Sequence, residues 1–261
     1  MIGEPEQNQA VWVPPGKPRR RPGRVIFWVL VAFSAALVVA GIGLGVATMR
    51  QYFVPSVSME KTLQPSDRLL VILGTDVRRG DIIIFSKPAT AASPADGRFV
   101  FVKRLIGLPG DHVACCDAKG RVTVNGKPLG ETYVDPAGPP SQFRFSITLG
   151  PGQIWVLGDN RSVSLDSRAW GPVPASGIIG YVSVVERGAS ATRLRTPQTF
   201  VADGLAPPDT RLAPYVLVFA LVPIGILALL VLAVIGIIRS AIRRSRSKRH
   251  LPAGYATYGP S

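Results

Sequence analysis

The segment FVFVKRLIG, Phe99–Gly107, is rich in branched and aromatic residues, which is typical of a β-strand. Clusters of glycine and proline separate it from similar segments on both sides, and Asn125-Gly126 is a typical hairpin turn. These spacings predict a mainly antiparallel β domain. The other segments with this composition are Arg68–Leu73, Asp81–Phe85, Arg121–Gly126, Gln153–Gly158 and Ile178–Glu186.

Two apolar runs enclose these strands, Val25–Met49 and Leu212–Ile238. Neither contains a charged residue, and each exceeds the roughly 20 helical residues that cross about 30 Å of hydrocarbon. Both are predicted to be transmembrane helices. The first run is longer than the apolar region of an ordinary cleaved secretory signal, so we expect a retained anchor.

Most of the net charge of +14 lies in two segments, the one before the first apolar run and the one after the second. Basic residues flank both predicted spans on their outer ends, which places both termini in the cytoplasm and residues 50–211 outside. The same residues are suited to anionic lipid headgroups, and nucleic-acid binding is the weaker interpretation. They are Lys17, Arg19, Arg20, Arg21, Arg24, Arg239, Arg243, Arg244, Arg246, Lys248 and Arg249.

These patterns divide the chain into segments of different character. We expect a two-pass protein of the plasma membrane with its β domain on the outer face. The predicted segments are a basic cytoplasmic tail (1–24), a transmembrane helix (25–49), an extracytoplasmic β domain (50–190), a linker (191–211), a second transmembrane helix (212–238) and a second basic cytoplasmic tail (239–261).

The stretch PSVSM, Pro55–Met59, offers two serines as candidate nucleophiles just after the first apolar run. Histidine is the usual base for a serine, but the chain contains only His112, in a predicted turn, and His250, in the second tail. A serine triad is therefore possible only through His112, and no motif supports it. Lysine is the other recognised base for a serine nucleophile.

Lys103 is the lysine best placed for that role. Strand alternation puts it on the same face as Phe99 and Phe101, and puts Arg104 on the opposite face. Aromatic neighbours can desolvate the amine, which must lose about 3 units from a pKa near 10.4 to act as a base at neutral pH. A surface lysine with its amine in water is the alternative, and these residues alone favour that alternative.

Four segments in this order resemble the sequence boxes of bacterial type I signal peptidases, which are membrane-bound serine proteases. The resemblance spans residues 54–186 and implies the signal-peptidase fold, with an antiparallel β domain held by membrane helices. The segments are PSVSMEKTL (Pro55–Leu63), RGDIIIF (Arg79–Phe85), FVKRLIGLPGD (Phe101–Asp111) and GDNRSVSLDSRAWGPVP (Gly158–Pro174).

The resemblance also implies a role for each matching residue. Ser58 is the implied nucleophile and Lys103 its general base, with no cofactor or metal. Ser56 and the backbone N–H of Ser58 form the implied oxyanion hole, and Ser164 holds the lysine amine. The implied supporting residues are Met59, Asp159, Asp166 and Arg168.

The implied substrates are preproteins that carry signal peptides, with small residues at positions −3 and −1 of the cleavage site. Membrane lipid and the export translocon are the expected partners, and no nucleic acid is expected. The chain departs from the family pattern at three positions: Lys61 stands where proline is common, and Ser162 and Val163 stand where Asp and Asn are common.

Two other classes of protein remain possible from the residues. One is a Ser/Lys protease of another kind, such as a self-cleaving repressor, although paired membrane spans argue against a cytoplasmic regulator. The other is a non-catalytic anchored β domain. The adjacent Cys115 and Cys116 do not discriminate between them, and the sequence leaves open whether they are bridged.

Overall fold

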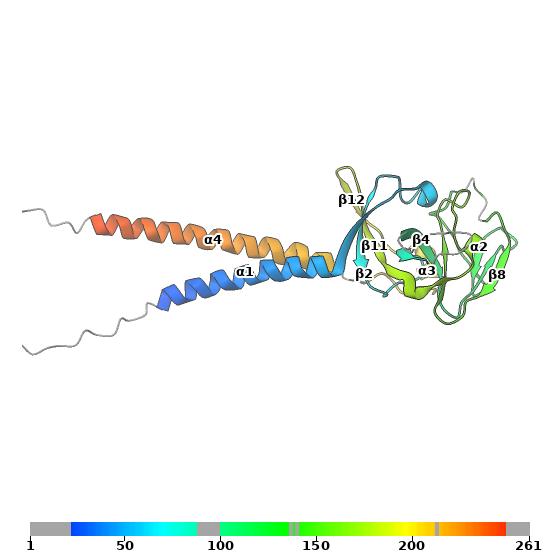
Figure 1. Cartoon of the computed structure of the whole chain (residues 1–261), viewed down its shortest axis with the longest axis horizontal. Coiled ribbons are helices and arrows are strands. Elements are labelled where there is room, and N and C mark those ends of the chain that lie inside the picture. The colour runs from blue at the N-terminus through cyan, green and yellow to red at the C-terminus, as the bar shows by residue number, and fades with distance from the viewer. Residues whose placement is uncertain (1–21, 88–99, 136–137, 139–140, 212–213, 249–261) are drawn as a thin grey trace, which may run out of the picture. The chain divides into compact units, whose positions relative to one another are not determined.

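The computed structural model describes residues 22–87, 100–135, 138, 141–211 and 214–248. They divide into two compact units, one formed by the described residues up to Val39 and from Leu221 onward, and the other by residues 40–220. The second unit contains the β-strands and every candidate site residue. Figure 1 labels elements of both units along the chain.

Two long helices lie at the ends of the described chain, α1 (Pro22–Thr48) and α4 (Pro214–Lys248). Their mean hydropathy is 2.7 over Gly23–Thr48 and 3.1 over Val216–Ser245, so both are long and apolar enough to cross a membrane. This is consistent with a membrane protein. Helix α4 continues ten residues past the apolar run, because nothing in the basic segment that follows breaks a helix.

The larger sheet has the strand order β1-β2-β11-β3-β4-β9-β10, and β12 pairs with β11. Its neighbouring strands are antiparallel throughout. Its strands are β1 (Met49–Phe53), β2 (Arg68–Leu73), β3 (Ile82–Ser86), β4 (Val100–Gly107), β9 (Gln153–Leu157), β10 (Val173–Pro174), β11 (Ile178–Arg187) and β12 (Ser190–Arg193).

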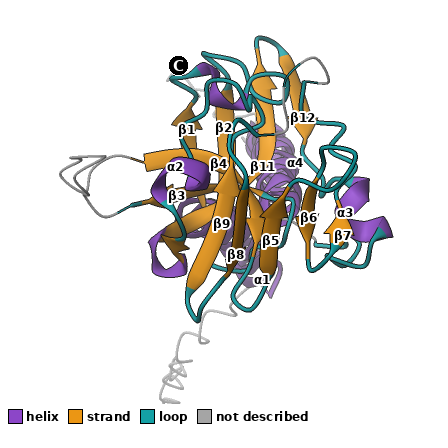
Figure 2. Cartoon of the chain, turned by 90° about the vertical axis from the view of Figure 1, so that its right-hand side faces the viewer, coloured by secondary structure: helices purple, strands orange, loops and turns teal. Residues whose placement is uncertain are grey.

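A smaller antiparallel sheet has the order β7-β6-β5-β8. Figure 2 shows both sheets in one β domain, with short helices outside them, so the predicted antiparallel fold class is confirmed. The remaining elements are β5 (His112–Cys115), β6 (Val122–Val124), β7 (Lys127–Pro128), β8 (Phe145–Thr148), α2 (Ser167–Trp170), α3 (Gln198–Ala202), and the 3₁₀ turns η1 (Val57–Met59) and η2 (Ala175–Gly177).

Each predicted strand overlaps an observed one, and Phe99 lies outside the described residues. Asn125 and Gly126 form the tight turn between β6 and β7, with φ of 52° and 77°, as the Asn-Gly pair predicts. The pattern missed six short strands (β1, β5, β7, β8, β10 and β12), which are too short or too mixed in composition to show alternation. The structure joins Cys115 at the end of β5 to Cys116 in a disulfide.

The segment 191–211, predicted to be a linker, is folded onto the β domain. It contains the end of β12 and helix α3, and the side chain of Phe200 in α3 is fully buried. In Figure 2, α3 lies beside β6 and β7. The prediction failed because this segment attaches through single anchoring residues, which leave no repeating apolar pattern in the sequence.

Candidate active site

Ser58 lies in the 3₁₀ turn η1, which follows the edge strand β1. The turn is held from below by Met59, which is 1% exposed in the core beneath the large sheet. It is held from the side by the backbone N–H of Asn160, which donates to the carbonyl of Ser58 at 3.1 Å. The hydroxyl of Ser58 therefore stands on a fixed turn and is half-exposed.

Lys103 lies on β4, opposite Ile83 of β3 in the sheet register. Phe101 and Leu105, two residues away on either side, belong with Ile83 to one apolar cluster. Lys103 is only 5% exposed, and its Nζ donates a hydrogen bond to Ser58 Oγ at 2.6 Å. A deprotonated amine in this position would instead accept the proton of the hydroxyl.

Burial lowers the pKa of Lys103 to about 8, from an ordinary value of 10.5. The carboxylates of Asp166 and Asp159 act in the opposite direction, and the positive charge of Arg168 adds to the lowering. A substantial fraction of the amine is therefore neutral in mildly alkaline solution. This is the protonation state that a general base requires.

Ser56 immediately precedes the 3₁₀ turn and is exposed. Its Oγ lies 3.2 Å from Ser58 Oγ, so the two hydroxyls are within hydrogen-bond distance and either can donate. The structure thus brings together the two serines and Lys103. A hydroxyl and a backbone N–H at this position are the type of donors that stabilise a developing oxyanion.

Asp159 contacts Arg104, the neighbour of Lys103, rather than Lys103 itself. Two hydrogen bonds of 2.8 and 2.6 Å join the Arg104 guanidinium to the Asp159 carboxylate, and Thr62 Oγ1 donates to the same carboxylate at 2.5 Å. Burial by itself would lower the pKa of Arg104, but the charge and hydrogen bonds of Asp159 outweigh it and raise that pKa. Through Thr62 this pair links β4 to residues 57–62, the nucleophile turn, because the backbone N–H of Thr62 donates to the carbonyl of Met59 in η1 at 3.1 Å.

Ser164 lies close to the site, but no hydrogen bond joins it to Lys103 among the described residues. Its Oγ is buried, and it helps to lower the pKa of the neighbouring Asp166 carboxyl. A side chain at Gly158 would collide with both Ser164 and the carbonyl of Ser58. The absence of a side chain at Gly158 therefore lets the two serine-bearing segments pack together.

Asp166 and Arg168 form a buried ion pair, with hydrogen bonds of 2.8 Å to each carboxylate oxygen. Asp166 also caps helix α2 and accepts a hydrogen bond from the backbone N–H of Gly158 at 2.9 Å. Burial would raise the pKa of Asp166, but the hydrogen bonds and charge of Arg168 and the Gly158 N–H lower it overall. The pair stabilises the loop that contains Ser164.

The sequence patterns missed three residues that support the site: Thr62, Glu131 and Arg161. Arg161 donates to both oxygens of Glu131, at 2.9 and 2.5 Å, and to the carbonyl of Gly158 at 3.0 Å. Thr62 and Arg161 both lie in the quoted boxes. Their polarity beside buried positions was the available signal, whereas nothing in the sequence pointed to Glu131.

Other candidates from the sequence lie elsewhere or outside the described residues. His112 is exposed on β5, and its Nε2 is 3.0 Å from Ser146 Oγ. His250 lies outside the described residues. Within the described part of the chain, no group of three or more His, Cys, Asp or Glu residues could hold a metal ion.

The three positions that depart from the family pattern are Lys61, Ser162 and Val163. Lys61 has a φ of 85°, a left-handed conformation that proline cannot adopt, and its Nζ donates to the carbonyl of Val134 at 2.6 Å. Ser162 and Val163 are exposed, and the carbonyl of Ser162 accepts a hydrogen bond from Gln142 at 2.9 Å.

Comparisons with known proteins identify the family of this chain. The family described as signal peptidase, peptidase S26, matches residues 25–186. A probable signal peptidase I-2 of Synechocystis is 40% identical over 155 residues, covering 58% of this chain and 68% of its own. Signal peptidase I V of Bacillus subtilis is 32% identical over 176 residues, covering 61% of this chain and 98% of its own.

A solved structure of a signal peptidase I from Enterococcus faecalis V583 is 32% identical in the aligned region. It covers 41% of this chain and 97% of its own, with a TM-score of 0.34.

Proposed function

Because the chain belongs to the signal peptidase family, peptidase S26, we propose that it is a membrane-bound serine endopeptidase that removes N-terminal signal peptides from exported preproteins. Ser58 is the nucleophile in this proposal and Lys103 is the general base. The observation that carries it is the 2.6 Å separation of Lys103 Nζ and Ser58 Oγ, in a site that lowers the pKa of the lysine.

In the first half of the reaction, Ser58 Oγ attacks the scissile carbonyl carbon while the neutral amine of Lys103 accepts the hydroxyl proton. The tetrahedral oxyanion is stabilised by the Ser58 backbone N–H and the Ser56 hydroxyl, and one such donor can contribute about 3 kcal/mol. Lys103 then passes the proton to the leaving amine, which is the new N-terminus of the mature protein.

The second half of the reaction releases the signal peptide from Ser58. Lys103, neutral again, removes a proton from a water molecule as that water attacks the acyl-enzyme ester. The proton returns to Ser58 Oγ when the ester bond breaks, which restores the free enzyme. The Asp166–Arg168 pair and Ser164 support the loop beside the amine throughout.

The membrane arrangement in this proposal follows from chain length and charge. Ser58 comes ten residues after the end of α1 at Thr48, a reach of at most about 35 Å, so the site stays close to the membrane surface. The basic segments favour a cytoplasmic position for both termini, which would leave the β domain on the outer face. Lipid and the export translocon are proposed partners there.

The deciding experiment compares cleavage of a preprotein whose signal ends in Ala-x-Ala by wild type and by Ser58→Ala, both purified in detergent. We expect Ser58→Ala to lose cleavage by at least about a thousandfold, because no other described residue replaces the nucleophile. Ser190→Ala, an exposed serine on β12, is the matched control and should cleave as wild type does. Cleavage by Ser58→Ala at the wild-type rate would refute the mechanism.

The pH dependence of kcat/KM gives a second test. We expect kcat/KM to rise with pH along an acidic limb centred near pH 8, because only the neutral amine of Lys103 can accept the proton. Initial cleavage rates between pH 6 and 9.5 measure this limb. A profile that is flat from pH 6 to 9 would contradict a titrating lysine base.

A further inference from the structure

The segment that follows the last strand of the large sheet makes several contacts with one turn of the β domain, Arg79–Asp81. Arg79 donates to the carbonyl of Leu205 at 2.7 Å. Asp81 accepts two hydrogen bonds from Arg211, at 2.9 and 2.8 Å. Gly80, which lies between these two residues, packs against Phe200. All three residues of the turn therefore contact this segment.

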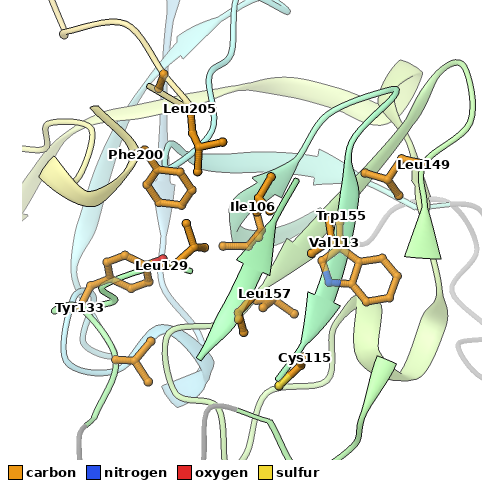
Figure 3. Packing of buried hydrophobic residues seen from close by; sticks show 14 residues of the cluster. Ile106, Val113, Cys115, Leu129, Tyr133, Leu149, Trp155, Leu157, Phe200 and Leu205 are labelled. Atoms are coloured by element: carbon orange, nitrogen blue, oxygen red, sulfur yellow. The ribbon is translucent and has the colours of Figure 1, made fainter. Parts of the chain in front are cut away.

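Phe200 packs directly against the backbone of Gly80. Its ring fills the space that a side chain at Gly80 would occupy, since an added Cβ there would lie 2.7 Å from Phe200 Cδ2. Gly80 also has a φ of +91°, so glycine is required by conformation as well. The same ring stacks on Tyr133, with centroids 6.5 Å apart and planes within 11°. Figure 3 shows the two rings next to each other in the buried cluster.

Two neighbours of Phe200, Gly80 and Tyr133, both contact Arg104. Arg104 Nη1 donates to the carbonyl of Gly80 at 2.7 Å, and the guanidinium lies 3.9 Å from the centre of the Tyr133 ring. Arg104 is 3% exposed and adjoins Lys103 on β4. Phe200 thus packs against two of the groups that fix this buried cation.

From Arg104 the contacts continue to the reacting atoms. The bidentate pair with Asp159 and the Thr62 hydroxyl joins β4 to the nucleophile turn. The other turn, Arg79–Asp81, is bound to β4 near Lys103. The backbone N–H of Gly80 donates to the carbonyl of Leu105 at 2.7 Å, and the backbone N–H of Leu105 donates to the carbonyl of Asp81 at 2.8 Å. The placement of Lys103 against Ser58 therefore depends on both sets of bonds.

We propose that Phe200 is a positioning residue of the active site, which acts through Gly80, Tyr133 and Arg104 to hold Lys103 against Ser58. The segment 196–211 is on this view part of the catalytic scaffold rather than a connection to α4. The proposal rests on the proposed function, because it concerns the efficiency of the same Ser58–Lys103 pair.

The test measures kcat and the acidic limb of the pH profile for Phe200→Ala, Phe200→Leu and the control Leu149→Ala in the full-length protein. Leu149 is 2% exposed and belongs to the same buried cluster, but lies at its far side from Phe200 in Figure 3. Leu149→Ala also removes buried apolar surface from this cluster, but at a residue that does not contact Gly80 or the Tyr133 ring. Thermal unfolding of each variant confirms that similar losses of stability are being compared.

We expect Phe200→Ala to lower kcat by about tenfold or more, because misplacement of a base by about 1 Å can cost a hundredfold. Its acidic limb should move to higher pH, since water entering a looser site weakens the desolvation that lowers the pKa of Lys103. Phe200→Leu, which keeps apolar volume but not the ring, should show a smaller loss and a smaller shift. Leu149→Ala should stay within twofold of wild type with an unchanged limb.

The proposal is overturned if folded Phe200→Ala matches Leu149→Ala in both kcat and limb position. Where Phe200→Ala does not accumulate, Phe200→Leu decides: a threefold or greater loss of kcat with an upward shift supports positioning, and wild-type values refute it. Failure of the wild type itself to cleave the preprotein would be a failure of the proposed function, which the Ser58→Ala comparison detects separately.

Discussion

Lys103 and Arg104 are adjacent cations on one strand, and both are almost fully buried, at 5% and 3% exposure. Lys103 contacts Ser58 on one face of the sheet, and Arg104 contacts Asp159 on the other. Burial lowers the pKa of Lys103 to about 8. Burial acts on Arg104 in the same direction, but Asp159 outweighs it and raises the pKa of the guanidinium.

The comparison shows that the partner, and not burial alone, determines what a buried cation can do. A carboxylate within hydrogen-bond distance keeps Arg104 charged and makes it a structural tie. The hydrogen-bond partner of Lys103 is the hydroxyl of Ser58, which cannot neutralise an ammonium, so the neutral amine becomes accessible at mildly alkaline pH. One strand thus presents a fixed charge on one face and a proton acceptor on the other.

The largest effect on activity is expected when lysine and arginine are exchanged at these two positions. We expect Lys103→Arg to lower the initial rate of preprotein cleavage by at least about a thousandfold, because a guanidinium does not lose its proton in proteins. The matched variant Arg104→Lys keeps a charge that can still pair with Asp159, and should lose no more than about tenfold. A Lys103→Arg protein that cleaves as fast as Arg104→Lys would show that the residue at position 103 is not a base.

Part of this arrangement could be predicted from the sequence. Strand alternation along Phe101–Gly107 predicted that Lys103 and Arg104 face opposite sides, and the structure agrees, with contacts to Ser58 and Asp159 respectively. Alternation does not reveal what covers each face. The partner Asp159 is 55 residues away in the chain, so its pairing with Arg104 depends on the folded position of β9.

Removing the charge of Arg104 should have the next largest effect, this time on stability. We expect Arg104→Met to lower the free energy of unfolding by about 3–5 kcal/mol, because it leaves the Asp159 carboxylate buried without its cation. Adding Asp159→Asn to that variant removes the uncompensated charge and should recover part of the loss. Thermal or denaturant unfolding in detergent measures both, and an Arg104→Met protein as stable as wild type would mean that the pair is not a tie.

The rest of the site and fold could not be predicted, for a physical reason. Phe200, Leu205 and Arg211 each anchor the segment 196–211 through a separate contact, so no apolar period marks it as folded. The buried ion pair of Glu131 and Arg161 was equally hard to predict, because in the sequence each residue looks like an ordinary charged residue of a surface loop. Such contacts depend on tertiary proximity, which local patterns do not encode.

Replacing Lys103 by methionine should change stability in the opposite direction to Arg104→Met. The unfolded chain binds the lysine proton up to about pH 10.5 and the folded protein only up to about pH 8, so burying the charged amine costs stability below pH 8, and this cost fades as the pH rises to 10.5. We therefore expect Lys103→Met to be more stable than wild type at pH 7, by about 3 kcal/mol on a scale of 1.36 kcal/mol per pKa unit. The advantage should shrink steadily between pH 8 and 10.

Melting temperatures of wild type and Lys103→Met in detergent at several pH values measure this difference. Lys119→Met, which replaces an exposed lysine, is the control that should show no such trend. If Lys103→Met is less stable than wild type at pH 7, the amine is stabilised in its charged form, and the contrast with Arg104 does not hold.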